Sequence, residues 1–331
     1  MKGRVFCIVL LFLLVPMLSL FAEGYSKYTP RPLEYRGKTY RGTTAVIDPN
    51  KPRSLDEKIV MDYPLSRHIE VDGFVRVKGH NMYDGDLQYC LIRVRKNDAD
   101  NGCHEIYWGR KDFDLRVWLR YGPGDYTITV ERGRVTNNLN YDGQACFHGT
   151  FRQVYRFTAT QTRDDGDERY FYPWRTFQAD DEKFRQLSQA IVDGYDTDRE
   201  KMKAIHDWVA AYLTYDYDSL KDGRRKKMDA LSALANRVAV CDGYTNLTTA
   251  LLLAAGFKAR QAHTILPRGR HSWVEVLHEG EWKLIDVTYD DANDILRHAY
   301  FLAPQEGIDG DHLPEKYRIT YIGSKDANHR F

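Results

Sequence analysis

The chain has 331 residues, of which 43% are hydrophobic, and its 48 Lys and Arg nearly balance its 47 Asp and Glu. This length and hydrophobic content suit one or two globular domains with substantial cores, and they exclude an intrinsically disordered chain. The near-neutral charge gives no reason to expect nucleic acid or an anionic membrane surface as a partner.

Residues 1–22 have the three parts of a secretory signal peptide. Lys2 and Arg4 form a short basic start, an apolar run interrupted by Pro16 follows, and the sequence around Ala22 suits cleavage. Because the run is short for a membrane-spanning helix, we favour cleavage over a retained anchor. We therefore expect an exported protein, periplasmic or extracellular, that meets the membrane only through this segment before cleavage.

Residues 23–64 are polar, contain several prolines, and are interpreted as an extended leader. In residues 65–169, short runs alternate apolar with polar residues and are separated by turn sequences such as "YDGD" and "GPGD". Such alternation is typical of an all-β sandwich. Nothing in this region gathers titratable residues into a catalytic arrangement.

Three cysteines, Cys90, Cys103 and Cys146, lie in the β region. An exported protein can oxidise one pair among them, and the sequence leaves all three pairings open. No two cysteines have the spacing of a zinc motif, so we expect no metal.

Helical periodicity begins at about residue 170, where we expect a second domain, 170–331. Thr197, followed three residues later by Glu200, indicates a helix N-terminus with a capping box. We expect helices in 180–194, 197–218, 229–237 and 241–255, and then strands in 258–266, 271–278, 281–289, 298–304 and 317–323. Helices followed by strands are an α+β layout.

Cys241 opens the fourth of these helices. The first turn of a helix carries partial positive charge and unpaired N–H groups, which make a thiol there easier to ionise, and a thiolate is the reactive form of cysteine. The alternative is that Cys241 is only a packing residue, because free cysteine is among the most buried residue types.

The two central strands form a hairpin by pattern, with Gly280 in the turn. If Leu277 faces Trp282, then His271 and Asp286 are diagonal neighbours on one face, with Cβ atoms about 7–8 Å apart at most. An imidazole and a carboxylate can bridge that distance. Each residue alone has an ordinary structural explanation, but thiol, imidazole and carboxylate together are the set that nucleophilic thiol catalysis requires.

Three ordered motifs resemble the transglutaminase-like superfamily. They are "AVCDGYTNL" around Cys241, "HSWVEV" from His271 and "WKLIDVTYD" around Asp286. The resemblance covers about 171–312 and is nearest to exported bacterial proteins akin to the kyphoscoliosis-peptidase type. It implies a transglutaminase-like, papain-like cysteine-enzyme fold. Ala239 and Val274 depart from the glycine and asparagine that are common in the family.

By this resemblance Cys241 is the nucleophile, His271 the general base and acid, and Asp286 the residue that orients His271. The implied activity is acyl transfer through a thioester on an amide or peptide bond, as a cysteine peptidase or amidase with a protein or peptide substrate, cell-wall peptide among them. Alternatives are a protein cross-linking transglutaminase and a non-catalytic interaction module of the cell envelope. No cofactor is required. The backbone N–H of Cys241 is one oxyanion donor, and the second, with Tyr215 or Tyr217 as candidates, stays open.

Overall fold

The computed structural model describes most of the chain from residue 33 to residue 304. The described residues are 33–40, 59–82, 88–96, 99–108, 112–135, 149–164, 173, 176–222, 228–267, 269–292, 295–304 and 311–312, with short strands at 26–28, 45–47 and 320–322. The expected signal peptide, 1–22, lies outside them, as do Cys146 and the side chains of Cys90 and Cys103. Export and disulfide pairing therefore stay predictions.

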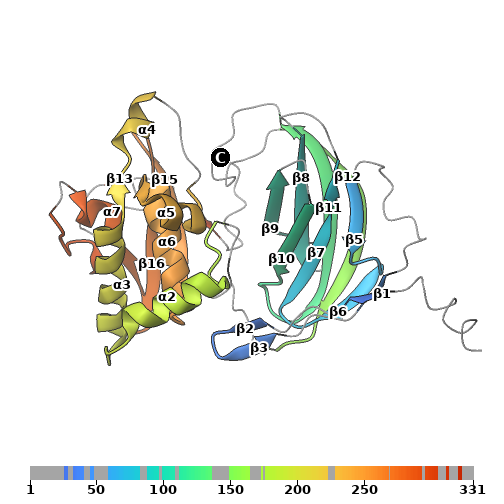
Figure 1. Ribbon diagram of the computed structural model, residues 1–331, viewed down its shortest axis with the longest axis horizontal. Coiled ribbons are helices and arrows are strands. Elements are labelled where there is room, and N and C mark those ends of the chain that lie inside the picture. The colour runs from blue at the N-terminus through green and yellow to red at the C-terminus, as the bar shows by residue number, and fades with distance from the viewer. Residues whose placement is uncertain are drawn as a thin grey trace, which may run out of the picture.

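Two β-sheets face each other as a sandwich on one side of the molecule (Figure 1). The smaller sheet has the order β10-β7-β5, with β10 (Asp112–Trp118), β7 (Phe74–Asn81) and β5 (Ile59–Tyr63). The larger has the order β6-β12-β11-β8-β9, with β6 (His68–Val71), β12 (Gly149–Gln161), β11 (Gly124–Val135), β8 (Gln88–Lys96) and β9 (Ala99–Trp108). Apolar residues from both sheets form one core, as the alternating pattern predicts.

The structure moves the start of the β-sandwich into the expected leader. Strand β5 lies within residues 23–64 and yet pairs with β7. Its buried residues Ile59, Met61 and Tyr63 alternate with half-buried ones, so the strand presents one apolar face to the sandwich. The leader also holds two short strand pairs, formed by β1 (Ser26–Tyr28), β2 (Leu33–Tyr35), β3 (Lys38–Tyr40) and β4 (Ala45–Ile47). Because residues 23–64 contain few apolar runs, the sequence does not predict these strands.

The β2–β3 hairpin links the sandwich to the second half of the chain. Tyr35 and Tyr40 pack around Trp118 of β10, with ring centroids 5.6 and 5.0 Å from it. These aromatic residues belong to the same apolar cluster as helix residues such as Phe184. Polar contacts add to the junction, since Arg116 pairs with Asp180 at 2.7 Å.

The second half is an α+β unit, as predicted. Its sheet has the order β18-β17-β16-β15-β19, all antiparallel, and consists of β18 (Phe301–Ala303), β17 (Glu281–Ile285), β16 (Gly269–His278), β15 (Ala259–Leu266) and β19 (Thr320–Ile322). Its helices are α2 (Glu182–Val192), α3 (Asp198–Tyr212), α4 (Tyr217–Asp222), α5 (Ala230–Asn236), α6 (Cys241–Ala254) and α7 (Val287–Asp290). A short parallel pair, β13 (Thr214–Tyr215) and β14 (Val238–Ala239), precedes α6.

Helix α6 is the centre of this unit and is buried along nearly its whole length. It contacts α2, α3 and α5 as well as β15 and β16, so its first residue is fixed on several sides (Figure 1). Gly243 permits the close approach to β14, because a Cβ there would lie 2.4 Å from the Cβ of Ala239. Gly256, with φ of 97°, follows the helix end as expected.

The predicted capping box of α3 is confirmed. The Thr197 hydroxyl accepts a hydrogen bond from the Glu200 backbone, and the Glu200 carboxylate accepts one from the Thr197 backbone. Among the helices that the structure describes, none has the length and apolar character needed to cross a membrane.

Candidate active site

The hairpin of β16 and β17 has the predicted register, with Leu277 opposite Trp282. Glu279 and Gly280 turn the chain with φ values of 52° and 82°, which match the twist of the two strands. The pairing brings His271 and Asp286 together as expected. His271 Nε2 donates a hydrogen bond to Asp286 Oδ2 over 2.6 Å, and both side chains are buried.

Asp286 itself is not in a strand, which corrects the expected strand 281–289. Strand β17 ends at Ile285, and Asp286 is the N-cap of α7, where its Oδ1 accepts a hydrogen bond from the Tyr289 backbone. A carboxylate at this position satisfies one of the unpaired N–H groups of the first helical turn. Asp286 therefore caps the helix with one carboxylate oxygen and accepts the hydrogen bond of His271 with the other.

Cys241 is the first residue of α6 and is 8% exposed. Its Sγ lies 3.9 Å from the carbonyl oxygen of Arg270, the residue before His271. Burial alone would lower the pKa of His271, but the charge and hydrogen bond of Asp286, followed by the hydrogen bond and charge of Cys241, raise that pKa to about 10. All three predicted site residues thus meet at one place.

The pKa of Asp286 moves in the opposite direction. Burial of its carboxyl would raise the pKa, but the positive charge and hydrogen bond of His271 and the hydrogen bond of His312 outweigh burial and hold the pKa well below its usual range. The pair therefore favours an ionised carboxylate beside a protonated imidazole.

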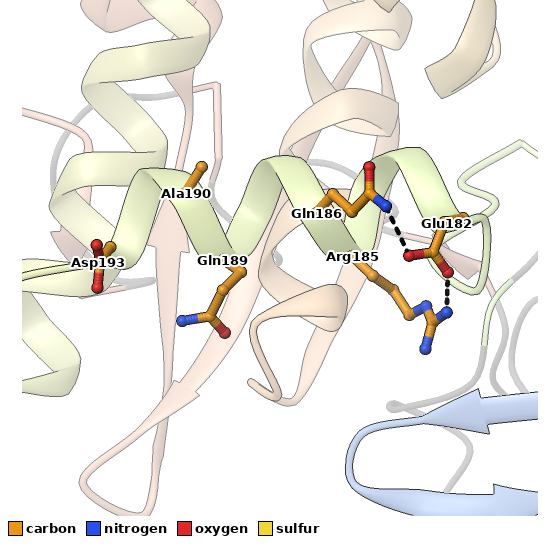
Figure 2. Close-up of a pocket in the computed structure, with 6 residues that line it drawn as sticks. All are labelled: Glu182, Arg185, Gln186, Gln189, Ala190 and Asp193. Atoms are coloured by element: carbon orange, nitrogen blue, oxygen red, sulfur yellow. Dashed lines mark hydrogen bonds and ion pairs between the residues drawn. The ribbon is translucent and has the colours of Figure 1, made fainter.

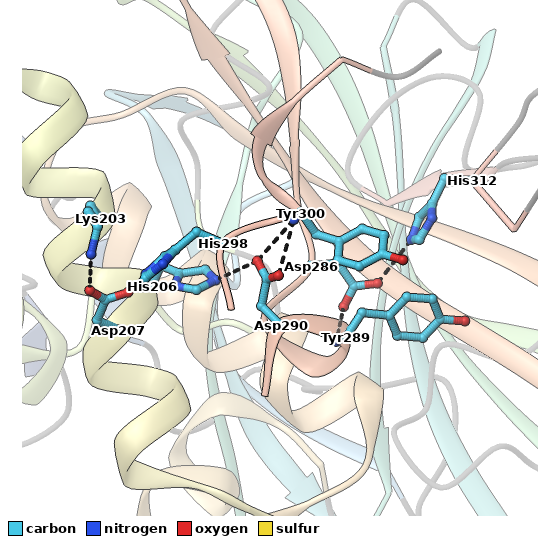
Figure 3. A network of polar contacts seen from close by, with 9 residues as sticks. All are labelled: Lys203, His206, Asp207, Asp286, Tyr289, Asp290, His298, Tyr300 and His312. Atoms are coloured by element: carbon cyan, nitrogen blue, oxygen red, sulfur yellow. Dashed lines mark hydrogen bonds and ion pairs between the residues drawn. The ribbon is translucent and has the colours of Figure 1, made fainter. Parts of the chain in front are cut away.

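His312 is a residue of this site that the sequence did not single out. Its Nε2 donates to Asp286 Oδ2 over 3.0 Å (Figure 3). His271 donates to the same oxygen, so one carboxylate oxygen accepts from two imidazoles. The ring of His312 meets Trp273 edge-on at 4.8 Å, while Tyr289 stacks on His271 at 4.5 Å. The signal available was the "DH" pair after the last predicted motif, but a lone histidine outside any periodic run carries little weight.

Comparison with known proteins assigns a family to part of the chain. The family model described as "Transglutaminase-like superfamily" matches residues 185–287. This part of the chain is a transglutaminase-like domain. Over 116 residues the chain is 23% identical to kyphoscoliosis peptidase of Mus musculus, in a match that covers 31% of this chain and 18% of that protein. The chain thus spans less than a fifth of this curated relative.

Solved structures also resemble the chain. A proposed cysteine protease from Cytophaga hutchinsonii is 16% identical, with 72% of this chain and 77% of that chain covered and a TM-score of 0.35. The periplasmic domain of TgpA from Pseudomonas aeruginosa is 14% identical, with 64% and 92% covered and a TM-score of 0.30.

Tyr215 of β13 pairs with Ala239, two residues before Cys241. Its pKa is raised well above the usual range, chiefly by burial and then by the negative charge of Cys241. Tyr217, the other oxyanion candidate, is 57% exposed, although its ring contacts that of Tyr215 at 4.8 Å. The position of Tyr215 makes it the better candidate for a second donor, beside the Cys241 backbone N–H, which has no intrahelical acceptor.

A hollow elsewhere in this domain lies along the outer face of α2 (Figure 2). It is lined by six residues of that helix and its end, Glu182, Arg185, Gln186, Gln189, Ala190 and Asp193. Glu182 already accepts hydrogen bonds from Gln186 and Arg185. None of the lining residues belongs to the Cys241 site.

The residues around Asp286 could in principle hold a metal ion, because ligand atoms of His271, Asp286 and His312 lie within 4.8 Å of one another. However, all three are buried, and each imidazole already donates to the carboxylate. This arrangement suits proton transfer better than metal binding, because all three side chains are shielded from the solvent that would deliver a cation.

Proposed function

We propose that the protein is an exported thiol-dependent acyl-transfer enzyme that cleaves amide or peptide bonds as a cysteine peptidase or amidase. The observation that carries the proposal is the buried hydrogen bond from His271 to Asp286, with Cys241, a thiol at a helix N-terminus, close enough to raise the pKa of His271. Membership of residues 185–287 in the transglutaminase-like superfamily supports the same chemistry.

The first half of the reaction forms a thioester. His271 holds the proton of Cys241, and the thiolate attacks the carbonyl carbon of the substrate, which moves the carbonyl electron pair onto oxygen. The Cys241 backbone N–H stabilises that oxyanion. When the carbon–nitrogen bond breaks, His271 gives its proton to the leaving amine, and Asp286 keeps the ring oriented throughout.

Water completes the cycle. Neutral His271 takes a proton from the attacking water, the thioester carbon–sulfur bond breaks, and a carboxylic acid leaves while the thiolate–imidazolium pair is restored. A lysine-type amine in place of water would form a new amide, and the protein would then be a cross-linking transferase.

Export and the substrate class are further parts of the proposal. The sequence of residues 1–22 supports export, and the name of the mouse relative supports a peptide substrate. A protein or peptide outside the cytoplasm, with cell-wall peptide among the candidates, is therefore the proposed substrate.

The alkylation rate of Cys241 with iodoacetamide tests the proposal. We expect rapid modification at pH 6, at least about 10-fold faster than for the same protein unfolded in urea, because an imidazolium beside the sulfur stabilises the thiolate. His271→Ala should remove this advantage. His278→Ala, a histidine at the other end of β16, is the matched control and should keep it.

Equal rates in the parent protein and in His271→Ala would refute the proposal and favour a non-catalytic interaction module. If alkylation behaves as expected, profiling with peptide libraries, with and without added primary amines, distinguishes hydrolysis from cross-linking by the product that forms.

A further inference from the structure

A second group of one carboxylate and two imidazoles lies away from Cys241. His206 and Asp207 come from α3, and His298 comes from the segment before β18. His206 Nδ1 and His298 Nε2 both point at Asp207 Oδ1, at 2.8 and 2.6 Å (Figure 3). The two rings lie side by side, with centroids 5.2 Å apart. The proposed reaction uses none of these residues.

The far side of His206 is also occupied. Its Nε2 donates to Asp290 Oδ2 over 3.1 Å, and both residues are fully buried. Asp290 in turn accepts hydrogen bonds from the Tyr300 backbone with both oxygens. A carboxylate that fixes the outer nitrogen of a histidine is the usual support of a metal-binding imidazole, because it sets the tautomer and leaves the other nitrogen for the ion.

We propose that His206, Asp207 and His298 bind a divalent transition metal, with Zn²⁺ as the principal occupant and water as its fourth ligand. Two imidazole nitrogens and a carboxylate oxygen are zinc ligands. With metal–ligand bonds of about 2.0 Å, tetrahedral ligand atoms lie about 3.3 Å apart. The two nitrogen–oxygen distances, now 2.8 and 2.6 Å, would therefore open by about 0.5 and 0.7 Å.

Solvent access allows a metal ion to reach these ligands. The side chains of Asp207 and His298 are 30% and 37% exposed, so an ion can enter from solvent. The metal would replace the protons that now lie between the nitrogens and Asp207. Lys203 also donates to Asp207, but on its other oxygen, and its side chain is 45% exposed and free to swing into water. Its positive charge should weaken binding.

The predicted metal would tie three parts of the fold together. It would join α3 to the segment that precedes β18, and through Asp290 it would brace the end of α7, the helix that Asp286 caps. Sequence spacing could not predict this group, because His298 lies 91 residues from Asp207.

Calorimetric titration of the tag-free, chelator-treated full chain with ZnCl₂ tests the proposal. We expect one zinc ion per chain to bind with a dissociation constant of about 10 μM or tighter, and Mg²⁺ to produce no such binding. His298→Ala should abolish this step, whereas His278→Ala should retain it. His271→Ala should also retain it, which separates this group from the buried group around Asp286.

Two further variants keep the test independent of any folding defect in His298→Ala. Lys203→Gln removes the competing charge and should tighten zinc binding several-fold, a gain that a damaged fold would not produce. Asp290→Asn should weaken zinc binding by about 10–100-fold, the usual effect of losing a carboxylate that supports a metal-bound histidine. The absence of zinc binding to the folded parent protein, or binding that His298→Ala and Lys203→Gln leave unchanged, would overturn the proposal.

Discussion

The two groups of one aspartate and two histidines have the same composition but different surroundings. Asp286 accepts from His271 and His312, and Asp207 accepts from His206 and His298. Asp286 is 1% exposed, and the next neighbour of its histidine is a thiol. Asp207 is partly exposed to solvent, and it also pairs with the ammonium group of Lys203. Burial and a neighbouring thiol therefore suit the Asp286 group to acid–base chemistry, whereas exposure leaves the Asp207 group open to cations.

The largest expected contrast is between the two aspartates. Asp286→Asn should lower kcat/KM by about 10³–10⁴-fold, because an amide no longer selects the reactive tautomer of His271 or stabilises its charge. Asp207→Asn should leave kcat/KM within about 3-fold of the parent value. Both are measured on the best substrate from library profiling. Equal losses in the two variants would remove the functional distinction between the groups.

The second contrast is in pH dependence. The pKa of His271 is raised to about 10 in the folded protein, from about 6.5 when unfolded. Its protonated form therefore contributes stability that is complete below about pH 6.5 and is lost as pH rises toward 10. The lowered pKa of Asp286 contributes stability that is lost only in acid, as pH falls below about 4.

Urea unfolding at pH 6.5, 8 and 9.5 measures this effect. The parent protein should lose stability across the series, and Asp286→Asn should lose much less, because its His271 lacks the partner that raises the pKa. Parallel declines in the two proteins would mean that other groups are responsible.

His312 should have a smaller effect than Asp286. It acts through the carboxylate as a positioning residue, so its removal costs one charge-assisted hydrogen bond, or about 10–100-fold in kcat/KM for His312→Ala. His312→Gln keeps an N–H donor and should recover part of the loss. A structural role alone would lower stability without moving the pH profile of kcat/KM, so both quantities are compared.

The smallest effect on the reactivity of Cys241 is expected from a change in the His206, Asp207 and His298 group of the metal-free protein. Asp207→Asn should lower the free energy of unfolding by about 1–3 kcal/mol, because Lys203, His206 and His298 lose a charged acceptor. The alkylation rate of Cys241 should stay within about 2-fold. A larger change in that rate would show that the two groups are coupled through α7.

The parts of the site that follow from local pattern could be predicted. The hairpin register places His271 beside Asp286, because strand alternation and turn length determine which residues face each other. The helix that Cys241 opens follows from an apolar run bounded by Gly256. These are short-range features that the sequence carries directly.

The rest depends on contacts between distant segments. His312 reaches Asp286 across 26 residues from outside any helix or strand that the structure describes, so no period marks it. The alternation around Asp286 continues into residues 287–289, which imitates a longer strand, and only the cap of α7 ends it. Strand β5 was missed for a similar reason, since its burial depends on pairing with β7.

The aromatic junction around Trp118 has a consequence for how the molecule melts. Because Tyr35, Tyr40 and Trp118 share one apolar cluster with the helices around α6, the sandwich cannot unfold without exposing part of the core beside the cysteine. Two units that share buried surface in this way lose structure cooperatively. Scanning calorimetry should therefore record a single endotherm for the whole chain, and the β-sandwich would be an integral support of the cysteine site and not a detachable module.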